Sequence, residues 1–117
     1  MSTEPASISE LFPVFADELE ELTRRAGRLD LTAQIRALAV VERCRCGEDN
    51  CAQFFTAPPP RGRYPTGHWN LLLPADSGLI VLDVVEETIV AIEVLDRPDV
   101  KTLLDAYLPP TPRMPDE

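Results

Sequence analysis

The most informative part of the chain is residues 78–95, which read GLIVLDVVEETIVAIEVL. Two runs rich in β-branched residues flank Glu86-Glu87, and this pattern predicts an antiparallel hairpin with a two-residue turn. In an unbroken register, one face carries Ile80, Leu82, Val84, Ile89, Ala91 and Glu93. The opposite face carries Leu79, Val81, Val85, Val90, Ile92 and Val94. Because both faces are largely apolar, we expect helices to cover one of them and a second layer, which a homodimer would supply, to cover part of the other.

Helical patterns lie on both sides of the strand region. A helix capped by Ser7 or Ser9 and ended by Gly27 is predicted first, followed by a short helix with Asp30 as its cap. The last helix follows Asp96-Arg97-Pro98-Asp99, and its apolar stripe consists of Val100, Leu103, Leu104, Tyr107 and Leu108. Further strands are predicted at 40–46, 51–57 and 69–73.

These elements predict one α+β domain over residues 9–108, with N-terminal helices, an antiparallel sheet of about five strands and a C-terminal helix packed on the sheet. We expect residues 1–8 to form a flexible N-terminus and the proline-rich residues 109–117 to form a disordered tail. Asp83 and Glu93 are isolated within apolar strands. Each is therefore expected either to face solvent at an edge or to have a buried partner, such as an arginine from a helix.

The chain has three cysteines, Cys44, Cys46 and Cys51, which lie on either side of a predicted turn at 47–50. Cys44 and Cys46 share one face of a strand, and closing the turn places Cys46 opposite Cys51. Three sulfurs therefore converge, and the single histidine, His68, follows the next loop and is a candidate fourth ligand. The set permits a tetrahedral Cys₃His zinc site, although C-x-C-x₄-C is not a common zinc spacing.

Two other interpretations of the cysteines are open. In the first, the three thiols are small, buried apolar side chains with no chemical role, which is common for free cysteine. A cross-strand disulfide between Cys46 and Cys51 is the third alternative. We expect no cofactor, and zinc is the one cofactor that the sequence leaves open.

A second candidate contact region is the loop before the third strand, where basic and aromatic residues mix. Arg61, Arg63 and Trp69 are candidates there for contact with a small anionic ligand. The sequence contains no recognisable nucleophile–base pair and no catalytic motif, so we expect a protein that is not an enzyme.

The formal net charge of −9 constrains the partners. Nucleic acids and anionic membranes bind basic proteins, so both are disfavoured, and no stretch approaches the ~18 apolar residues of a membrane-spanning helix. The first residues lack the features of a signal peptide, which predicts a cytoplasmic location. We therefore expect an acidic protein-interaction module with a basic protein partner, for example an immunity or inhibitor protein; the alternative is a zinc- or thiol-binding protein.

The cysteine region resembles a group of small uncharacterised actinobacterial proteins. Their signature, R-C-x-C-G-x-x-x-C-x-x-F, matches residues 43–54, which read RCRCGEDNCAQF. Residues 89–95 also resemble the strand that precedes the last helix in that group. The resemblance implies a compact, independent domain and names no activity.

Overall fold

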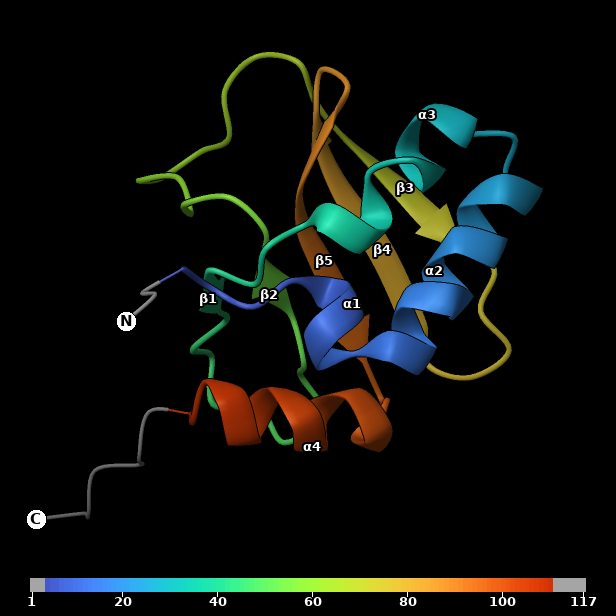
Figure 1. Ribbon diagram of the computed structural model, residues 1–117. Helices are drawn as coiled ribbons and strands as arrows, with labels where there is room; N and C mark the ends of the chain where they lie inside the picture. The colour runs from blue at the N-terminus through green and yellow to red at the C-terminus, as the bar shows by residue number, and fades with distance from the viewer. Residues whose placement is uncertain (1–3, 111–117) are drawn as a thin grey trace, which may run out of the picture.

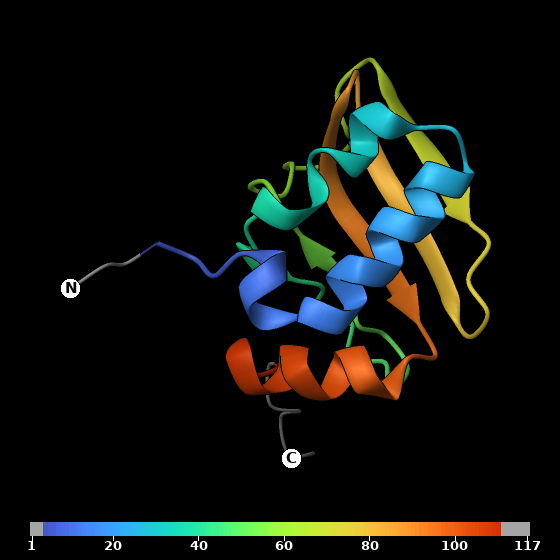
Figure 2. The same ribbon diagram turned by 45° about the vertical axis from the view of Figure 1, so that its right-hand side comes forward.

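The computed structural model describes residues 4–110 and shows an α+β fold. The sheet contains β1 (Glu42–Arg43), β2 (Phe54–Phe55), β3 (His68–Leu73), β4 (Leu79–Val85) and β5 (Thr88–Leu95), in the antiparallel order β1-β2-β5-β4-β3. The helices are α1 (Ile8–Leu11), α2 (Pro13–Arg25), α3 (Leu29–Thr32), the 3₁₀ helix η1 (Ile35–Ala37) and α4 (Pro98–Tyr107). Helix α2 crosses one face of the sheet, and α4 lies below α1 across the end of the same layer (Figure 1, Figure 2).

The β4–β5 hairpin has the predicted two-residue turn, but its register differs from the prediction. Val84 pairs with Ile89, whereas Asp83 pairs with Ala91, so Val90 is an extra residue that forms a β-bulge in β5. Beyond the bulge every side chain of β5 changes face relative to an unbroken ladder. The predicted placement of Ala91, Glu93, Ile92 and Val94 was therefore wrong.

The bulge sorts the hairpin residues by polarity. The helix-covered face carries six fully buried side chains, Ile80, Leu82, Val84, Ile89, Ile92 and Val94. The opposite face carries Asp83 and Glu93 among its apolar residues. The second face is thus less apolar than an unbroken register implies, and the homodimer stays a prediction.

The helical layer supplies the other half of the core. Phe12, Phe15 and Leu19 pack with the sheet residues, and the rings of Phe54 and Phe12 are in tilted contact with centroids 5.3 Å apart. Burial of such side chains is the main stabilising contribution to the fold. Within residues 4–110, no helix has the length and apolar character needed to cross a membrane.

The N-terminal part of the fold begins earlier than predicted. The Ala6 N–H donates to the Tyr107 hydroxyl at 2.7 Å, and Ile8 is fully buried. Ser7 caps α1 in a capping box with Glu10, while Pro13 occupies the first turn of α2. Residues 6–8 thus belong to the domain. Residues 1–3 of the predicted flexible N-terminus and residues 111–117 of the predicted tail lie outside the described residues.

Helices α3 and α4 each differ from prediction at one residue. Asp30 lies within the first turn of α3 and pairs with Arg28, so it is not the N-cap. Val100 and Leu104 of α4 are buried as predicted, whereas Leu103 is 44% exposed. Within α4 the buried residues are Val100 and Leu104, a narrow stripe that does not include Leu103.

Candidate metal centre

The three cysteines lie in the segment that connects β1 and β2. Glu42 pairs with Phe55 and Arg43 with Phe54, and the ladder does not extend to the predicted pairing of Cys46 with Cys51. The Cys44 N–H donates to the Gln53 carbonyl at 2.8 Å, so the pairing continues one step beyond β1. Regular strand ends before Cys44, and the thiols are therefore carried by a loop rather than by the predicted longer strands.

This loop, residues 44–51, is tied to the end of β5. Cys51 forms an isolated antiparallel bridge with Leu95. The Asp96 N–H donates to the Asn50 carbonyl at 3.0 Å, and the Asn50 side-chain amide donates to Asp96 at 3.2 Å. Gly47, with φ of 80°, adopts the left-handed conformation that the turn requires. The cysteine positions are consequently fixed from both sides of the turn.

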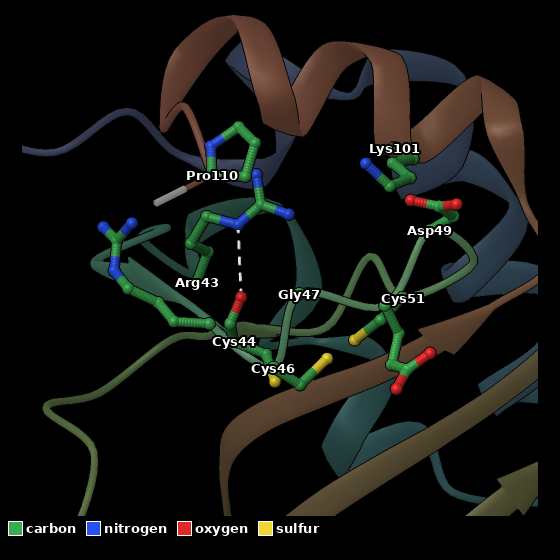
Figure 3. A pocket seen from close by; sticks show the side chains of 10 residues that line it. Arg43, Cys44, Cys46, Gly47, Asp49, Cys51, Lys101 and Pro110 are labelled. Atoms are coloured by element: carbon green, nitrogen blue, oxygen red, sulfur yellow. Dashed lines mark hydrogen bonds between the residues drawn. The ribbon is translucent and has the colours of Figure 1, made fainter. Parts of the chain in front are cut away.

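The three Sγ atoms lie within 4.8 Å of one another, and no other group of three or more potential ligands occurs among the described residues. All three are free thiols: Cys51 is buried, Cys44 is half-buried and Cys46 is exposed. Figure 3 shows their sulfurs on one side of a shared pocket. In a tetrahedral zinc site with Zn–S bonds of ~2.3 Å, sulfurs are roughly 3.8 Å apart. Shifts of about 1 Å or less would therefore give ligand geometry, and the donor set suits a soft cation.

The surroundings affect the thiols differently. The backbone N–H of Glu48 bonds the Cys46 sulfur and lowers the pKa of that thiol, while the Glu48 carboxylate opposes this effect. Burial, with smaller contributions from Cys44 and Cys46, raises the pKa of Cys51 to about 12, although a hydrogen bond from the Gln53 backbone opposes this effect. A bound divalent cation would reverse this, because metal ligation stabilises the thiolate form.

Beside the thiols is a pocket of about 600 Å³. Lys101 and Pro110 line it from the C-terminal part of the chain, and Figure 3 shows them across the pocket from the cysteines. Arg43 also lines it; its guanidinium is almost completely buried and donates to Asp105 at 2.6 Å and to the Leu108 carbonyl at 2.8 Å. This ion pair connects the start of the cysteine loop to α4.

The structure does not bring His68 to the cysteines. His68 begins β3, at the opposite edge of the sheet from β1 and β2. Its Nε2 atom lies 2.8 Å from Asp83 Oδ1, and its ring stacks on Tyr64 with centroids 4.2 Å apart. The proposed role of His68 as fourth ligand is therefore wrong in this fold, because the chain crosses the width of the sheet between β2 and β3.

The other predicted contact residues do not form a shared site with the cysteines. The Trp69 indole N–H donates to the Glu86 carbonyl at 2.8 Å, and the Arg28 guanidinium covers its ring at 4.7 Å. Both polar and aromatic surfaces of Trp69 thus have partners in the chain. Arg61 and Arg63 are exposed in the loop between β2 and β3, and their contact with an anion stays a prediction.

Asp83 and Glu93 form a carboxyl pair that the sequence analysis missed. Asp83 is only 3% exposed; its Oδ1 accepts from His68 and from Asn70, while its Oδ2 is buried without a conventional donor within the described residues. Burial, a hydrogen bond with Asp83 and the Asp83 charge raise the pKa of Glu93 to about 7. The partner is thus another carboxyl group and not an arginine. The bulge at Val90 is what brings both residues to one face.

Comparison of the chain with protein-family models, curated proteins and solved structures found no match. The resemblance of residues 43–54 to the actinobacterial signature accordingly stays a prediction, and arguments about function depend on the geometry of the site.

Proposed function

We propose that the protein binds a zinc ion through Cys44, Cys46 and Cys51. The observation that carries this proposal is the convergence of three free thiols to within 4.8 Å on a loop that is held at both ends. Thiolate sulfur is the donor that zinc prefers among protein side chains, and three donors form the protein part of many open zinc sites.

The exposure of the thiols supports zinc binding over a purely structural role. Cysteines that act as small apolar side chains are usually buried. Here Cys46 is exposed and Cys44 is half-buried, and both point toward Cys51 at the pocket (Figure 3). Packing alone gives no reason for three sulfurs to meet at the surface of the fold.

The charge around the site does not decide between zinc and inert thiols. Three thiolates and one Zn²⁺ carry a net charge of −1, and a cationic environment would stabilise such a centre. Arg43, Arg45 and Lys101 line the adjoining pocket together with Glu48 and Asp49. Asp105 pairs with both Arg43 and Lys101, and Glu42 pairs with Arg45, so these positive charges are already balanced by carboxylates.

Elemental analysis of the protein, purified under reducing conditions and dialysed, tests the proposal. We expect one zinc per chain, and each of the variants Cys44→Ser, Cys46→Ser and Cys51→Ser should retain less than about a tenth of it, since a site with two thiolates binds far more weakly. His68→Gln is the matched control and should retain the full amount. A wild-type protein without stoichiometric metal, whose three thiols all react as freely as in the denatured chain, would overturn the proposal.

The alternative of an acidic protein-interaction module stays a prediction with weaker support. Its basis was the acidic surface, yet the carboxylates of α2 are engaged by arginines of the same chain: Glu18 by Arg97, Glu20 by Arg36, and Glu21 by Arg24 and Arg25. These contacts reduce the charge that α2 offers to a partner. Salt-sensitive capture of basic proteins would support the alternative, and capture that ignores salt would contradict it.

A further inference from the structure

The cysteine site provides three ligands, whereas tetrahedral zinc takes four. In structural zinc sites the protein supplies all four, and in sites that act on ligands one position is left open. Glu48 and Asp49 line the same pocket, but neither belongs to the group of converging ligand atoms, and His68 lies at the other edge of the sheet. A zinc ion held by the three thiols would thus have its fourth position toward the pocket.

The pocket has the dimensions of a ligand site. Its volume of about 600 Å³ falls in the range of roughly 300–1,000 Å³ that small-molecule sites occupy. The exposed Cys46 lies at its surface, so an incoming molecule can reach the sulfurs without a change in the fold. The remaining lining side chains, apart from the two carboxylates, are arginine, lysine, glycine and proline, which are poor zinc ligands.

The chemistry of the site selects a class of ligand. A soft cation that already has three thiolates favours sulfur as its next donor. A second group on the same molecule would lie against the side of the pocket where Lys101 extends from α4, and Asp49 lines the pocket there as well. The Lys101 ammonium has three N–H donors and gives one to Asp105 at 2.7 Å. A carboxylate on the ligand matches this group in charge and in hydrogen bonding.

We propose that the fourth position binds the sulfur of a small thiol that also carries a carboxylate, with Lys101 as the residue that recognises the carboxylate. This inference rests on the proposed zinc function. On binding, the S–H bond breaks, the proton passes to solvent, and the sulfur electron pair forms the bond to the metal in place of water. No electron is gained or lost by the protein or the ligand.

Cobalt-loaded protein tests the inference, because Co²⁺ replaces zinc and its absorption reports the number of thiolate ligands. The probes are 3-mercaptopropionate, 2-mercaptoethanol and propionate, which separate the contributions of sulfur and carboxylate. Both thiols should increase the thiolate-to-cobalt charge-transfer absorption, and 3-mercaptopropionate should half-saturate at about a tenfold lower concentration, equivalent to about 1.4 kcal/mol. Propionate should leave this absorption unchanged.

Two variants test whether Lys101 is the residue that recognises the carboxylate of the ligand. Lys101→Gln should remove most of the preference for 3-mercaptopropionate and leave the binding of 2-mercaptoethanol unchanged. Arg25→Gln removes the same charge from an exposed position on α2 and should preserve the preference.

The possible results distinguish the two proposals. If the protein takes up no Co²⁺, the zinc function itself is wrong. If Co²⁺ binds but no thiol changes the spectrum, the metal function stands and the open position is wrong. In that case a changed spectrum in Glu48→Gln, without added thiol, would identify Glu48 as the fourth ligand. Equal affinity for the two thiols would overturn the role of Lys101.

Discussion

The Asp83–Glu93 pair predicts an unusual dependence of stability on pH. An ordinary glutamate titrates at 4.5, whereas Glu93 in the folded protein titrates at about 7, chiefly because of burial. Between these pH values the folded state holds a proton that the unfolded state has released. The free energy of unfolding contributed by this group is therefore highest below pH 4.5 and falls as the pH rises to about 7.

The magnitude follows from the interval between the two pKa values. Each pH unit contributes about 1.4 kcal/mol, so an interval from 4.5 to about 7 sets an upper limit of about 3 kcal/mol. Glu93 is half-buried, and water screens part of the interaction with Asp83, which lowers the expected effect to about 1–2 kcal/mol. Above pH 7 both states have released the proton, and the contribution becomes constant.

The variant Glu93→Gln tests this prediction. An amide can donate to Asp83 at every pH, so the variant should lack the loss of stability between pH 4.5 and 7 and should exceed the wild type by about 1–2 kcal/mol at pH 7.5. Urea unfolding followed by circular dichroism, with a reductant and a chelator in every sample, gives the free energies. Glu87→Gln, in the exposed turn of the same hairpin, is the matched control. If the wild type and Glu93→Gln lose stability in parallel from pH 4.5 to 7, then Glu93 does not hold an extra proton in the folded state.

Two further predictions concern residues that support the segments next to the cysteine loop. Gly78→Ala should destabilise the fold by at least about 2 kcal/mol, because φ is +72° and a Cβ would lie 2.6 Å from the Leu95 carbonyl oxygen. Urea unfolding should show a smaller loss, of about 1 kcal/mol, for the control Gly27→Ala, where φ is +75° and no atom lies within 4 Å of the added Cβ. Equal losses would mean that the close approach at Gly78 has no effect. Arg43→Met should cost about 2–3 kcal/mol by leaving Asp105 with one partner fewer, and Asp105→Asn in the same chain should recover part of this in a double-mutant cycle. A loss below about 0.5 kcal/mol for Arg43→Met would show that the ion pair does not hold α4.

Local patterns predicted the elements of the fold because side-chain alternation and helical periodicity depend on neighbouring residues. The convergence of Cys44, Cys46 and Cys51 was predictable for the same reason, since a short turn returns the chain to the two cysteines that precede it. The positions of β4, β5 and α4 followed closely from their apolar patterns. The fold class and the convergence of the three thiols could therefore be predicted from local sequence patterns alone.

The bulge at Val90 was not predicted, although one residue gave a usable signal. An unbroken ladder would place the Glu93 carboxyl on the helix-covered face, beside Ile80, where it would lose its contact with water. One inserted residue disrupts the strand pairing at a single position and moves the Glu93 carboxyl to the other face of the sheet. A charged residue on the predicted core face was thus an indication of the bulge and of the Asp83–Glu93 pair.

The place of His68 could not be predicted because it depends on which edge of the sheet β3 joins. Short sequence separation from Cys51 suggested proximity, yet the loop between β2 and β3 carries the chain past β5 and β4. The pairing of β3 with β4 is selected by the apolar face shared by Leu71, Leu73, Ile80 and Leu82. This contact is between segments distant from the cysteines, and no spacing within the cysteine region reveals it.

The position of the thiols relative to the core indicates what a metal would do in this protein. The hydrophobic cluster of the described residues joins the helices to the sheet without a cysteine. A chain of 117 residues can fold on such a core, unlike small zinc domains that are unfolded without their metal. The cysteine loop is also tied to β5 by its own hydrogen bonds, so its geometry does not depend on a metal as a cross-link. A metal at this site would therefore not be required for the chain to fold. Its binding would still stabilise the folded state, because the unfolded chain lacks the assembled site, and it would change the chemistry of the adjoining pocket.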